Sequence, residues 1–184
     1  PQQMYTLARQ LKAMQDSRDA VEPAVRKQLV LDARREKAHN VSEVQTSSGR
    51  LLRYGKVVQL QHRASGKQVC ITHQASASHR DARRVSLCEE SSVGEASWFK
   101  IMPRLRVHGE GEKVRHGDPV VFESVTTGLK LHVHGGEFGL AGRSEVNASA
   151  DATTLKLSMY SQSTQDSAYV RGGDAIRILH READ

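Results

Sequence analysis

The fold is decided by a pattern that begins at residues 54–62, which read YGKVVQLQH. The pattern returns as HGDPVVFES at residues 116–124 and as GGDAIRILH at residues 172–180. Each copy carries a glycine followed by an apolar run with partial alternation, which is typical of a turn that leads into a half-buried strand. The leading glycines are about sixty residues apart, and a period of this length indicates a repeat architecture.

The first two copies also agree downstream, because Ser65-Gly66 and Thr127-Gly128 lie at matching distances from Gly55 and Gly117. A small residue with glycine between two apolar runs predicts a hairpin turn. One hairpin cannot bury its apolar face alone, so several must close around a shared core. We therefore predict a mainly β fold. Three units of about four short strands favour a β-trefoil, since a propeller blade is shorter and a sandwich need not repeat.

The remaining elements of the body are predicted from apolar periodicity. Residues 85–87 and 155–157 alternate as strands do, and residues 98–103 form a buried strand that ends at a proline. We expect loops or linkers at residues 104–111, 135–149 and 158–171, which are rich in polar residues and glycine. The predicted core consists of Val57, Val58, Leu60, Trp98, Phe99, Val121, Phe122 and Leu131.

Residues 1–48 differ in composition and predict a helical arm. Good helix formers dominate this stretch. A first helix is expected over residues 2–19, where apolar residues recur near helical spacing. A second helix is expected from Pro23 to about Val44, because proline suits the first turn of a helix. Val25, Leu29, Leu31 and Ala33 are available for burial.

The composition narrows the functional class. The 184 residues are 38% hydrophobic and carry a net charge of +6, from 27 basic and 21 acidic side chains. A basic balance favours acidic partners such as phosphates, lipid headgroups or acidic proteins. No apolar run is long enough to cross a membrane, and no signal peptide is evident. We expect an excised piece of a longer chain, since the sequence starts with Pro1.

The cysteines and aromatic residues carry further expectations. Cys70 and Cys88 lie in strand-like runs without metal or redox spacing, so we expect two free thiols in a reducing compartment, with a disulfide as the other interpretation. Aromatic residues make up only 4% of the chain, and no recognition motif is present. Nucleic acid is therefore not an expected partner.

Residues capable of site chemistry do not assemble into a recognisable catalytic motif. No nucleophile elbow or phosphate loop occurs, so we expect neither an enzyme nor a cofactor. His132 and His134 would share a strand face near His108 and His116, but zinc needs three or four fixed ligands, and we predict no metal site. Two aspartates, Asp118 and Asp174, follow turn glycines at matching positions and are predicted to cap the turns through backbone N–H groups. The arginines at 80, 83 and 84 are expected to be solvated.

Four segments resemble a known family. They are LRYGKVVQLQH (52–62), which looks like the start of a MIR-type repeat, GEASWFKIMP (94–103), EGEKVRHGD (110–118) and GGDAIRILH (172–180). Their order and spacing are similar to the N-terminal region of inositol trisphosphate and ryanodine receptors. The resemblance covers roughly residues 49–180, and the helical arm agrees with it in type and place.

The resemblance implies a domain organisation. Residues 49–160 would form the β-trefoil body known as the suppressor-like domain, preceded by the arm at residues 1–48. Residues 161–184 would form a linker and the first strand of a following trefoil. The family's first trefoil unit lies upstream of the arm and has no match here, so about two of the three units are expected.

The resemblance also implies function, partners and location. The chain would be a regulatory and assembly domain of a tetrameric calcium-release channel, on the cytosolic face of the endoplasmic or sarcoplasmic reticulum. Its partners would be the following ligand-binding domains and neighbouring subunits, without membrane insertion by this chain. The family's phosphate-binding residues lie in the following domains, so we expect no ligand site and no tight binding of inositol trisphosphate here.

One loop is the candidate contact site, comprising Arg104, Leu105, Arg106, Val107 and His108. The family's equivalent loop is proposed to reach neighbouring domains, and inositol trisphosphate receptors have an aromatic residue at the position of Leu105. An exposed leucine between arginines suits an interface core with a charged rim. An ordinary exposed hairpin loop is the other interpretation.

Two further functions stay open from the sequence. The first is a MIR-type module that binds glycan or peptide in a protein resembling an O-mannosyltransferase. The second is a lectin-like trefoil acting alone, which would need exposed aromatic residues to stack on sugars. The low aromatic content and the helical arm favour the channel family over both.

Overall fold

The computed structural model describes residues 27–28, 30–32, 34–35, 42, 45–89, 94–135, 144–160 and 168–180. The chain divides into two compact units, residues 1–48 and 49–184. In the first unit, the described residues from Lys27 to Ser42 are helical, and Gln28 donates hydrogen bonds to Asp32 one turn later. Leu31 is 48% exposed. The predicted helix at residues 2–19 and the other apolar positions named for the arm lie outside the described residues.

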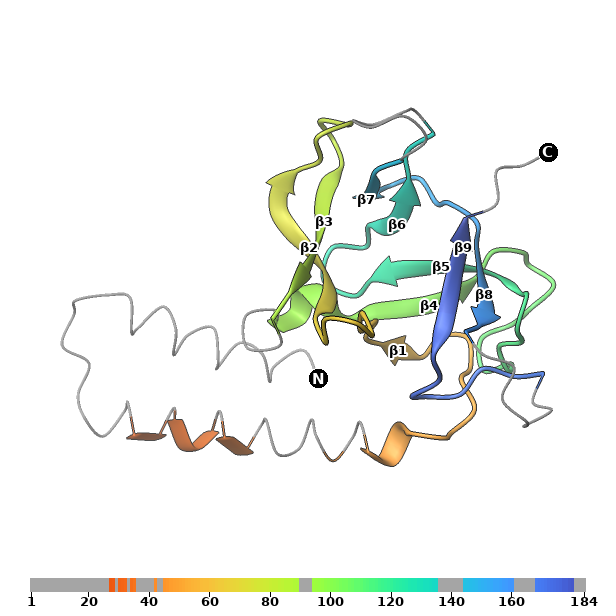
Figure 1. The fold of residues 1–184 in the computed structure, drawn as a ribbon, viewed down its shortest axis with the longest axis horizontal. Coiled ribbons are helices and arrows are strands. Elements are labelled where there is room, and N and C mark those ends of the chain that lie inside the picture. The colour runs from red at the N-terminus through yellow and green to blue at the C-terminus, as the bar shows by residue number, and fades with distance from the viewer. Residues whose placement is uncertain are drawn as a thin grey trace. The chain divides into compact units, whose positions relative to one another are not determined.

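The second unit is a strongly curled antiparallel sheet (Figure 1). Its described strands are β1 (Val57–Val58), β2 (Gln68–Ala75), β3 (Arg83–Cys88), β4 (Phe99–Pro103), β5 (Pro119–Ser124), β6 (Lys130–Val133), β7 (Val146–Ser149), β8 (Leu155–Met159) and β9 (Ile176–His180). A short 3-10 helix, η1 (Gly94–Ser97), precedes β4. The prediction of a mainly β fold is confirmed.

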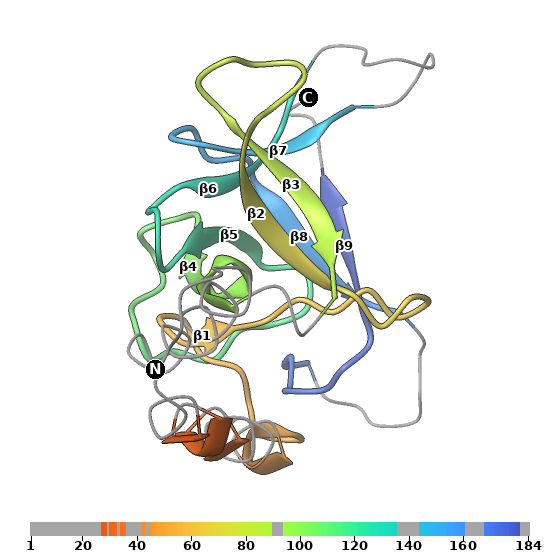
Figure 2. The ribbon, with the colours of Figure 1, turned by 90° about the vertical axis from the view of Figure 1, so that its left-hand side faces the viewer.

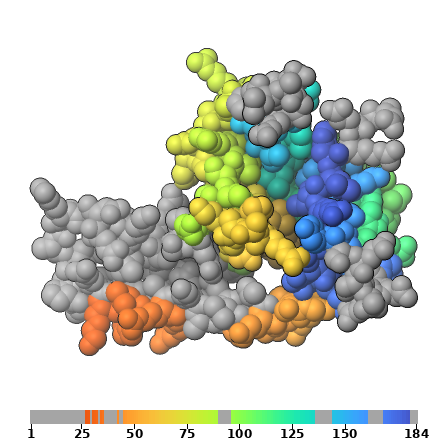
Figure 3. Space-filling view, viewed as in Figure 1, coloured from red at the N-terminus to blue at the C-terminus, as the bar shows by residue number. Residues whose placement is uncertain are grey.

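The sheet follows a single path with one branch. Hydrogen bonding connects the strands in the order β1-β4-β5-β6-β7-β3-β2, and β8 pairs with both β5 and β9. The β2–β3 hairpin forms a long curved ribbon at one end of that path (Figure 2). In the space-filling view, the yellow segment that precedes β2 lies beside the blue surface of β8 and β9 (Figure 3). Arg63 of that segment and Arg177 of β9 both lie over the ring of Tyr160.

Three short segments, around Leu52, Val114 and Val170, form a closed ring of backbone hydrogen bonds. The N–H of Leu52 donates to the carbonyl of Val170 (2.8 Å), Val170 donates to Val114 (2.9 Å), and Val114 donates to Leu52 (2.9 Å). The flanking bridge pairs are Leu51 with Arg171, Arg53 with Lys113, and Arg115 with Tyr169. Each segment therefore pairs with both of the others, and their inward side chains meet in the core.

Each ring segment ends in a turn with the same backbone geometry. Gly55, Gly117 and Gly173 have φ values of 86°, 89° and 85°, in the left-handed region that favours glycine. Asp118 and Asp174 accept hydrogen bonds from backbone N–H groups three residues earlier, at 2.8 and 2.7 Å. The predicted capping by these two aspartates is confirmed.

The hairpins that follow the first two turns also match. Gly66 donates to the carbonyl of His62 at 2.8 Å, and Gly128 donates to Ser124 at 2.9 Å. These are the small-residue–glycine turns that the sequence predicted. Equal spacing in the sequence thus corresponds to equal backbone bonding in the structure.

The predicted core is partly right. Phe99, Val121, Phe122 and Leu131 are buried, and Val58 and Leu60 pack against the core. Val57 is 43% exposed, and Trp98 is only half-buried, so both assignments are wrong. Side chains alternate between the two faces of a strand, so Val58 and Phe99 point into the core while their neighbours Val57 and Trp98 do not. The core also contains residues not predicted: Tyr54, Ile71, Ile101, Val114, Val120, Ala148, Leu155, Leu157 and Val170.

Two predicted loops contain ordered β structure. Residues 146–149 form β7, held between β6 and β3, with Asn147 and Ala148 fully buried. Residues 158–159 belong to β8, while residues 168–171 lie in the ring, where Val170 is buried. Neither segment has a strong apolar pattern of its own, so pairing with distant strands decides its conformation.

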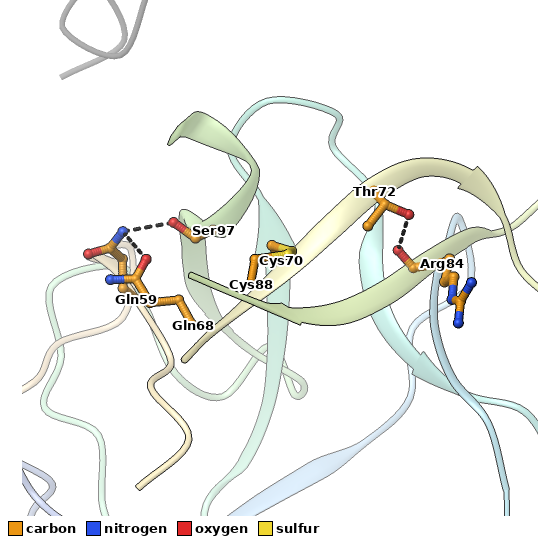
Figure 4. Close-up of a disulfide and its surroundings, with 7 residues drawn as sticks. All are labelled: Gln59, Gln68, Cys70, Thr72, Arg84, Cys88 and Ser97. Atoms are coloured by element: carbon orange, nitrogen blue, oxygen red, sulfur yellow. Dashed lines mark hydrogen bonds between the residues drawn. A yellow bond between two sulfur atoms is a disulfide. The ribbon is translucent and has the colours of Figure 1, made fainter. Parts of the chain in front are cut away.

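The two cysteines form a disulfide, so the expectation of free thiols is wrong for this structure. Cys70 in β2 and Cys88 in β3 occupy diagonal positions of the hairpin, with Cα atoms 6.3 Å apart (Figure 4). Beside them, the Gln59 amide donates to the Ser97 hydroxyl at 2.7 Å and to the Gln68 carbonyl oxygen at 3.0 Å. The cysteines therefore give no support to a reducing compartment.

The tip of the β2–β3 hairpin is tied to the segment before β7 by one carboxylate. Glu145 accepts hydrogen bonds from the hydroxyls of Ser76 and Ser78 and from the backbone N–H groups of Ala77 and Ser78. Burial opposes ionisation of this group, but the hydrogen bonds outweigh it and lower the pKa of Glu145 to about 2.

Candidate interdomain contact surface

The candidate loop begins where β4 ends at Pro103, and its base is fixed. The backbone N–H of Arg104 donates to the carbonyl of Pro119 at 3.0 Å, and its Nε donates to the hydroxyl of Thr154 at 3.2 Å. The N–H of His108 donates to the carbonyl of Leu105 at 3.4 Å, which closes the loop into a turn. The start of the loop is thus attached to β5 and to Thr154, and its own turn fixes the conformation of the tip.

Two apolar side chains project from this tip. Leu105 is 53% exposed and Val107 is 75% exposed, and both neighbouring arginines, Arg104 and Arg106, are exposed as well. An exposed apolar pair costs free energy in water that burial against a partner would recover. The surface offers an apolar centre with a cationic rim, the composition found in the middle of protein interfaces.

His108 behaves differently from the other four loop residues. Its ring stacks on the ring of Tyr54 with centroids 5.6 Å apart, and its Nδ1 lies 3.0 Å from a carboxylate oxygen of Glu112. The other Glu112 oxygen accepts the N–H of Gly109 at 3.0 Å. These bonds, first of all that with His108, lower the pKa of Glu112. His108 therefore serves to seat the loop rather than to present an exposed side chain.

Glu110, two residues after the candidate loop, covers the first glycine turn. Glu110 forms an ion pair with Lys100 of β4 at 3.1 Å, and its side chain lies against Gly55. A Cβ atom added at Gly55 would overlap the Glu110 side chain. A side chain at position 55 would therefore have to displace Glu110, and the positive φ is the stronger reason for glycine there.

Tyr54 joins the first two turns, and the sequence did not identify it as a site residue. The side chain is buried, and its hydroxyl donates to Asp118 at 3.0 Å. Burial, reinforced by the bond to Asp118, raises the pKa of the Tyr54 hydroxyl. The available signal was a large aromatic residue directly before a repeat glycine, where the second copy has His116.

The histidines considered as metal ligands are dispersed. His132 lies 3.1 Å from the side-chain oxygen of Asn147, the ring of His134 faces His79 at 6.5 Å between centroids, and His108 is seated on Tyr54. Across the described ranges, no group of three or more potential ligands could hold a metal ion. No helix in the described part of the chain is long and apolar enough to cross a membrane.

The arginines at positions 80, 83 and 84 are exposed on the β2–β3 hairpin. Arg83 donates to the carbonyl of His73 at 2.7 Å, and Arg84 donates to the side chain of Gln74 at 3.3 Å. These contacts hold the side chains along their own hairpin. They form a solvated basic edge rather than a converging cradle.

Comparison with known proteins identifies relatives of the chain. A family model described as "Inositol 1,4,5-trisphosphate/ryanodine receptor" matches residues 4–166. The inositol 1,4,5-trisphosphate receptor itr-1 of Caenorhabditis elegans is 30% identical over an alignment of 167 positions, which covers 84% of this chain and 6% of that receptor. The chain thus spans a small part of the length of its relative.

A solved structure shares the fold. The SDF2-like protein from Arabidopsis thaliana superposes with a TM-score of 0.59, covering 71% of this chain and 74% of that one. The two sequences are 17% identical over this region. At that identity, the likeness concerns the fold alone.

Proposed function

Since the chain belongs to the inositol 1,4,5-trisphosphate/ryanodine receptor family, we propose that it is an N-terminal regulatory and assembly domain of a calcium-release channel. The family is one of receptors rather than of enzymes. The observation that carries the proposal is the anchored loop, which presents Leu105 and Val107 to solvent between two arginines. Such a surface suits docking to another domain.

We propose that the body is a β-trefoil of which about two of the three units are present. Support comes from the closed ring through Leu52, Val114 and Val170, and from the three matching glycine turns. The pairing of β4 with β5 and of β8 with β9 also uses corresponding positions of successive units. The arm at residues 1–48 and the body from residue 49 are proposed as separate domains, in line with the division into compact units.

Residues 161–184 remain proposed as a linker and a strand that resembles the start of a following trefoil. In this chain, β9 pairs with β8 over five residue pairs, from Leu155 with His180 to Met159 with Ile176. The segment thus contributes a strand to the body described here. The same repeat sequence suits either position, because both require a glycine turn followed by an apolar strand.

The mechanism we propose is a bias on channel state through unequal docking. A loop contact that forms in one channel state and is lost in another shifts the population by the difference in binding free energy. The partners would be the following ligand-binding domains and neighbouring subunits of a tetramer. The location would be the cytosolic face of an intracellular calcium-store membrane.

The experiment uses the full-length receptor that contains this chain. Leu105→Ala combined with Val107→Ala removes the apolar centre of the loop and leaves both arginines. We expect about tenfold weaker domain coupling, measured as site-specific crosslinking and as the agonist concentration for half-maximal calcium release, because interface anchors contribute more than about 1 kcal/mol each.

The matched control is Leu87→Ala, which truncates an exposed leucine on β3, away from the loop. Thermal melts of each variant check the fold, since exposed substitutions change stability by only about 0.5 kcal/mol. The proposal fails if the loop variant and the Leu87 control both release calcium like the parent receptor.

A further inference from the structure

The outward face of the ring is strongly basic. Along each ring segment, side chains alternate between the core and solvent, so the neighbours of buried Val114 and Val170 point away from the core. The first segment contributes Arg53, the second contributes Lys113 and Arg115, and the third contributes Tyr169. Two cross-strand bridges, Arg53–Lys113 and Arg115–Tyr169, hold the four residues side by side.

These residues line an open pocket of about 640 Å³. The rest of its wall comes from His108 of the candidate loop and from three residues that follow the loop, Glu110, Gly111 and Glu112. A volume of this size lies within the range of small-molecule sites, roughly 300–1,000 Å³. The pocket therefore joins three chain segments that lie far apart in the sequence.

The charges in the pocket are not balanced locally. Glu110 is paired with Lys100, and Glu112 binds His108 and the N–H of Gly109. None of the ion pairs found among the described residues involves the three cations at positions 53, 113 and 115. The three cations outnumber the two carboxylates of the pocket wall, and Glu110 already shares its charge with Lys100, so the pocket keeps an excess of positive charge.

Tyr169 brings two of these cations together. The Nζ of Lys113 lies 5.2 Å from the centre of its ring, and the Cζ of Arg115 lies 5.5 Å from it. Each contact is a favourable cation–π interaction, but both place positive charge over the same aromatic ring. Like charges this close repel, and an anion between them would relieve that repulsion.

Arg53 adds a donor from the opposite segment. Its Nη1 donates to the carbonyl of Gly111 at 2.7 Å, which fixes the guanidinium at the edge of the pocket and leaves its other N–H groups available. The arginine at the corresponding place in the third segment, Arg171, donates instead to the carbonyl of Gly49 and does not line the pocket. The site is therefore confined to the side of the ring formed by the first two segments and Tyr169.

We propose that this pocket binds a small anion carrying two or more phosphate groups, held by Arg53, Lys113 and Arg115. Guanidinium groups match phosphate oxygens with paired, charge-assisted hydrogen bonds, and the lysine adds a point charge. The carboxylates of Glu110 and Glu112 at the rim limit the affinity, and the proposal departs from the expectation that this chain has no ligand site. The proposal does not depend on the docking function of the loop.

The test is a titration of the 184-residue chain with inorganic pyrophosphate at constant ionic strength, followed by NMR. We expect saturable shifts of the Arg53 and Arg115 side-chain Nε–H signals and of the Tyr169 ring. Arg115→Gln should weaken binding about tenfold or more, because a hydrogen bond to a charged group is lost. Lys113→Gln provides a second variant that removes charge without removing any backbone hydrogen bond.

The matched control is Arg84→Gln, which makes the same charge change on the solvated hairpin. It should bind pyrophosphate like the parent chain. Unchanged amide shifts at Leu52, Val114 and Val170 would show that each variant keeps the ring. The proposal is overturned if the shifts spread over all basic residues without saturating, or if Arg84→Gln weakens binding as much as Arg115→Gln.

A second arm distinguishes a free phosphate from a lipid headgroup. Vesicles containing phosphatidic acid are compared with pure phosphatidylcholine vesicles in a sedimentation assay. Binding to the former that is lost in Lys113→Gln, together with pyrophosphate binding, assigns the site to phosphate on a membrane surface. Pyrophosphate binding alone assigns it to a soluble anion, and the absence of both refutes the proposal.

Discussion

The turns at Gly55 and Gly117 have the same backbone and different surroundings. Their φ values agree within a few degrees. The N–H of Gly55 donates to the carbonyl of Ile101 in β4, and the N–H of Gly117 donates to the carbonyl of Leu157 in β8. Yet Gly55 is covered by Glu110, whereas a Cβ at Gly117 would meet nothing within 4 Å. The repeat determines the backbone of both turns. The segment with Glu110 covers the first turn and not the second, and the candidate loop and the basic pocket both lie beside that covered turn.

The strands beneath the two turns provide the largest expected effect. Ile101 and Leu157 are both fully buried and take corresponding places in β4 and β8. Ile101→Ala and Leu157→Ala should each lower the free energy of unfolding by about 2–5 kcal/mol, through lost burial and the cavity left behind. Urea denaturation measures this. Costs that differ by several kcal/mol would break the equivalence of the two units.

Alanine at the glycines themselves should separate the two turns. Gly117→Ala carries only the cost of a left-handed conformation, about 1–2 kcal/mol. Gly55→Ala carries that cost and must also move the exposed Glu110 side chain away from its ion pair with Lys100, so we expect up to about 1 kcal/mol more. The double variant Gly55→Ala with Glu110→Ala should regain part of the difference in denaturation experiments. A Gly117→Ala cost as large as that of Gly55→Ala would contradict the role of the covering loop.

Removing the hydroxyl that links the turns should have a smaller effect. Tyr54→Phe keeps the buried ring and the stacking on His108 but loses the hydrogen bond to Asp118. We expect a loss of about 1 kcal/mol, since Asp118 keeps its bond from the N–H of Arg115. Thermal unfolding monitored by circular dichroism gives the value. An unchanged midpoint would show that the two turns are not coupled through this bond.

Acid should loosen the covered turn in a measurable but small way. The pKa of Glu112 is lowered, chiefly by its bond with His108. The stability that ionised Glu112 gives to this turn is therefore fully present above the ordinary carboxyl pKa. It is lost as pH falls through the lowered pKa. Hydrogen exchange of the Gly109 N–H, which donates to Glu112, should therefore accelerate at low pH beyond the intrinsic pH dependence. Glu112→Ala removes both acceptor oxygens and should show fast exchange at every pH. A pH-independent protection in the parent would refute the bond.

The sequence predicted those features that are encoded locally. These features depend on contacts within a few residues of the chain. They are the glycines with positive φ, the small-residue turns, and the aspartates that accept a hydrogen bond from the N–H three residues earlier. The matching hairpins at Gly66 and Gly128 follow from the same local chemistry. The exposed apolar pair of the loop was likewise visible as a leucine and a valine among arginines, directly after a proline that ends a strand.

Features that depend on distant pairing were missed. The strand at residues 146–149 and the ring segment at residues 168–171 have weak patterns, and their neighbours in space order them. The disulfide required knowing that Cys70 and Cys88 lie diagonally across one hairpin. The basic pocket needed three segments brought together, so no spacing in the sequence could reveal Arg53 beside Lys113.

Amide hydrogen exchange at the three ring residues tests most directly whether the glycine-led segments form one closed unit. The N–H groups of Leu52, Val114 and Val170 each donate to the next segment around the ring, at 2.8–2.9 Å. In the 184-residue chain, all three should exchange slowly and at similar rates, near the limit set by global unfolding. A Val170 amide that exchanges like an exposed one, while Val114 stays protected, would show that the third segment does not belong to this body.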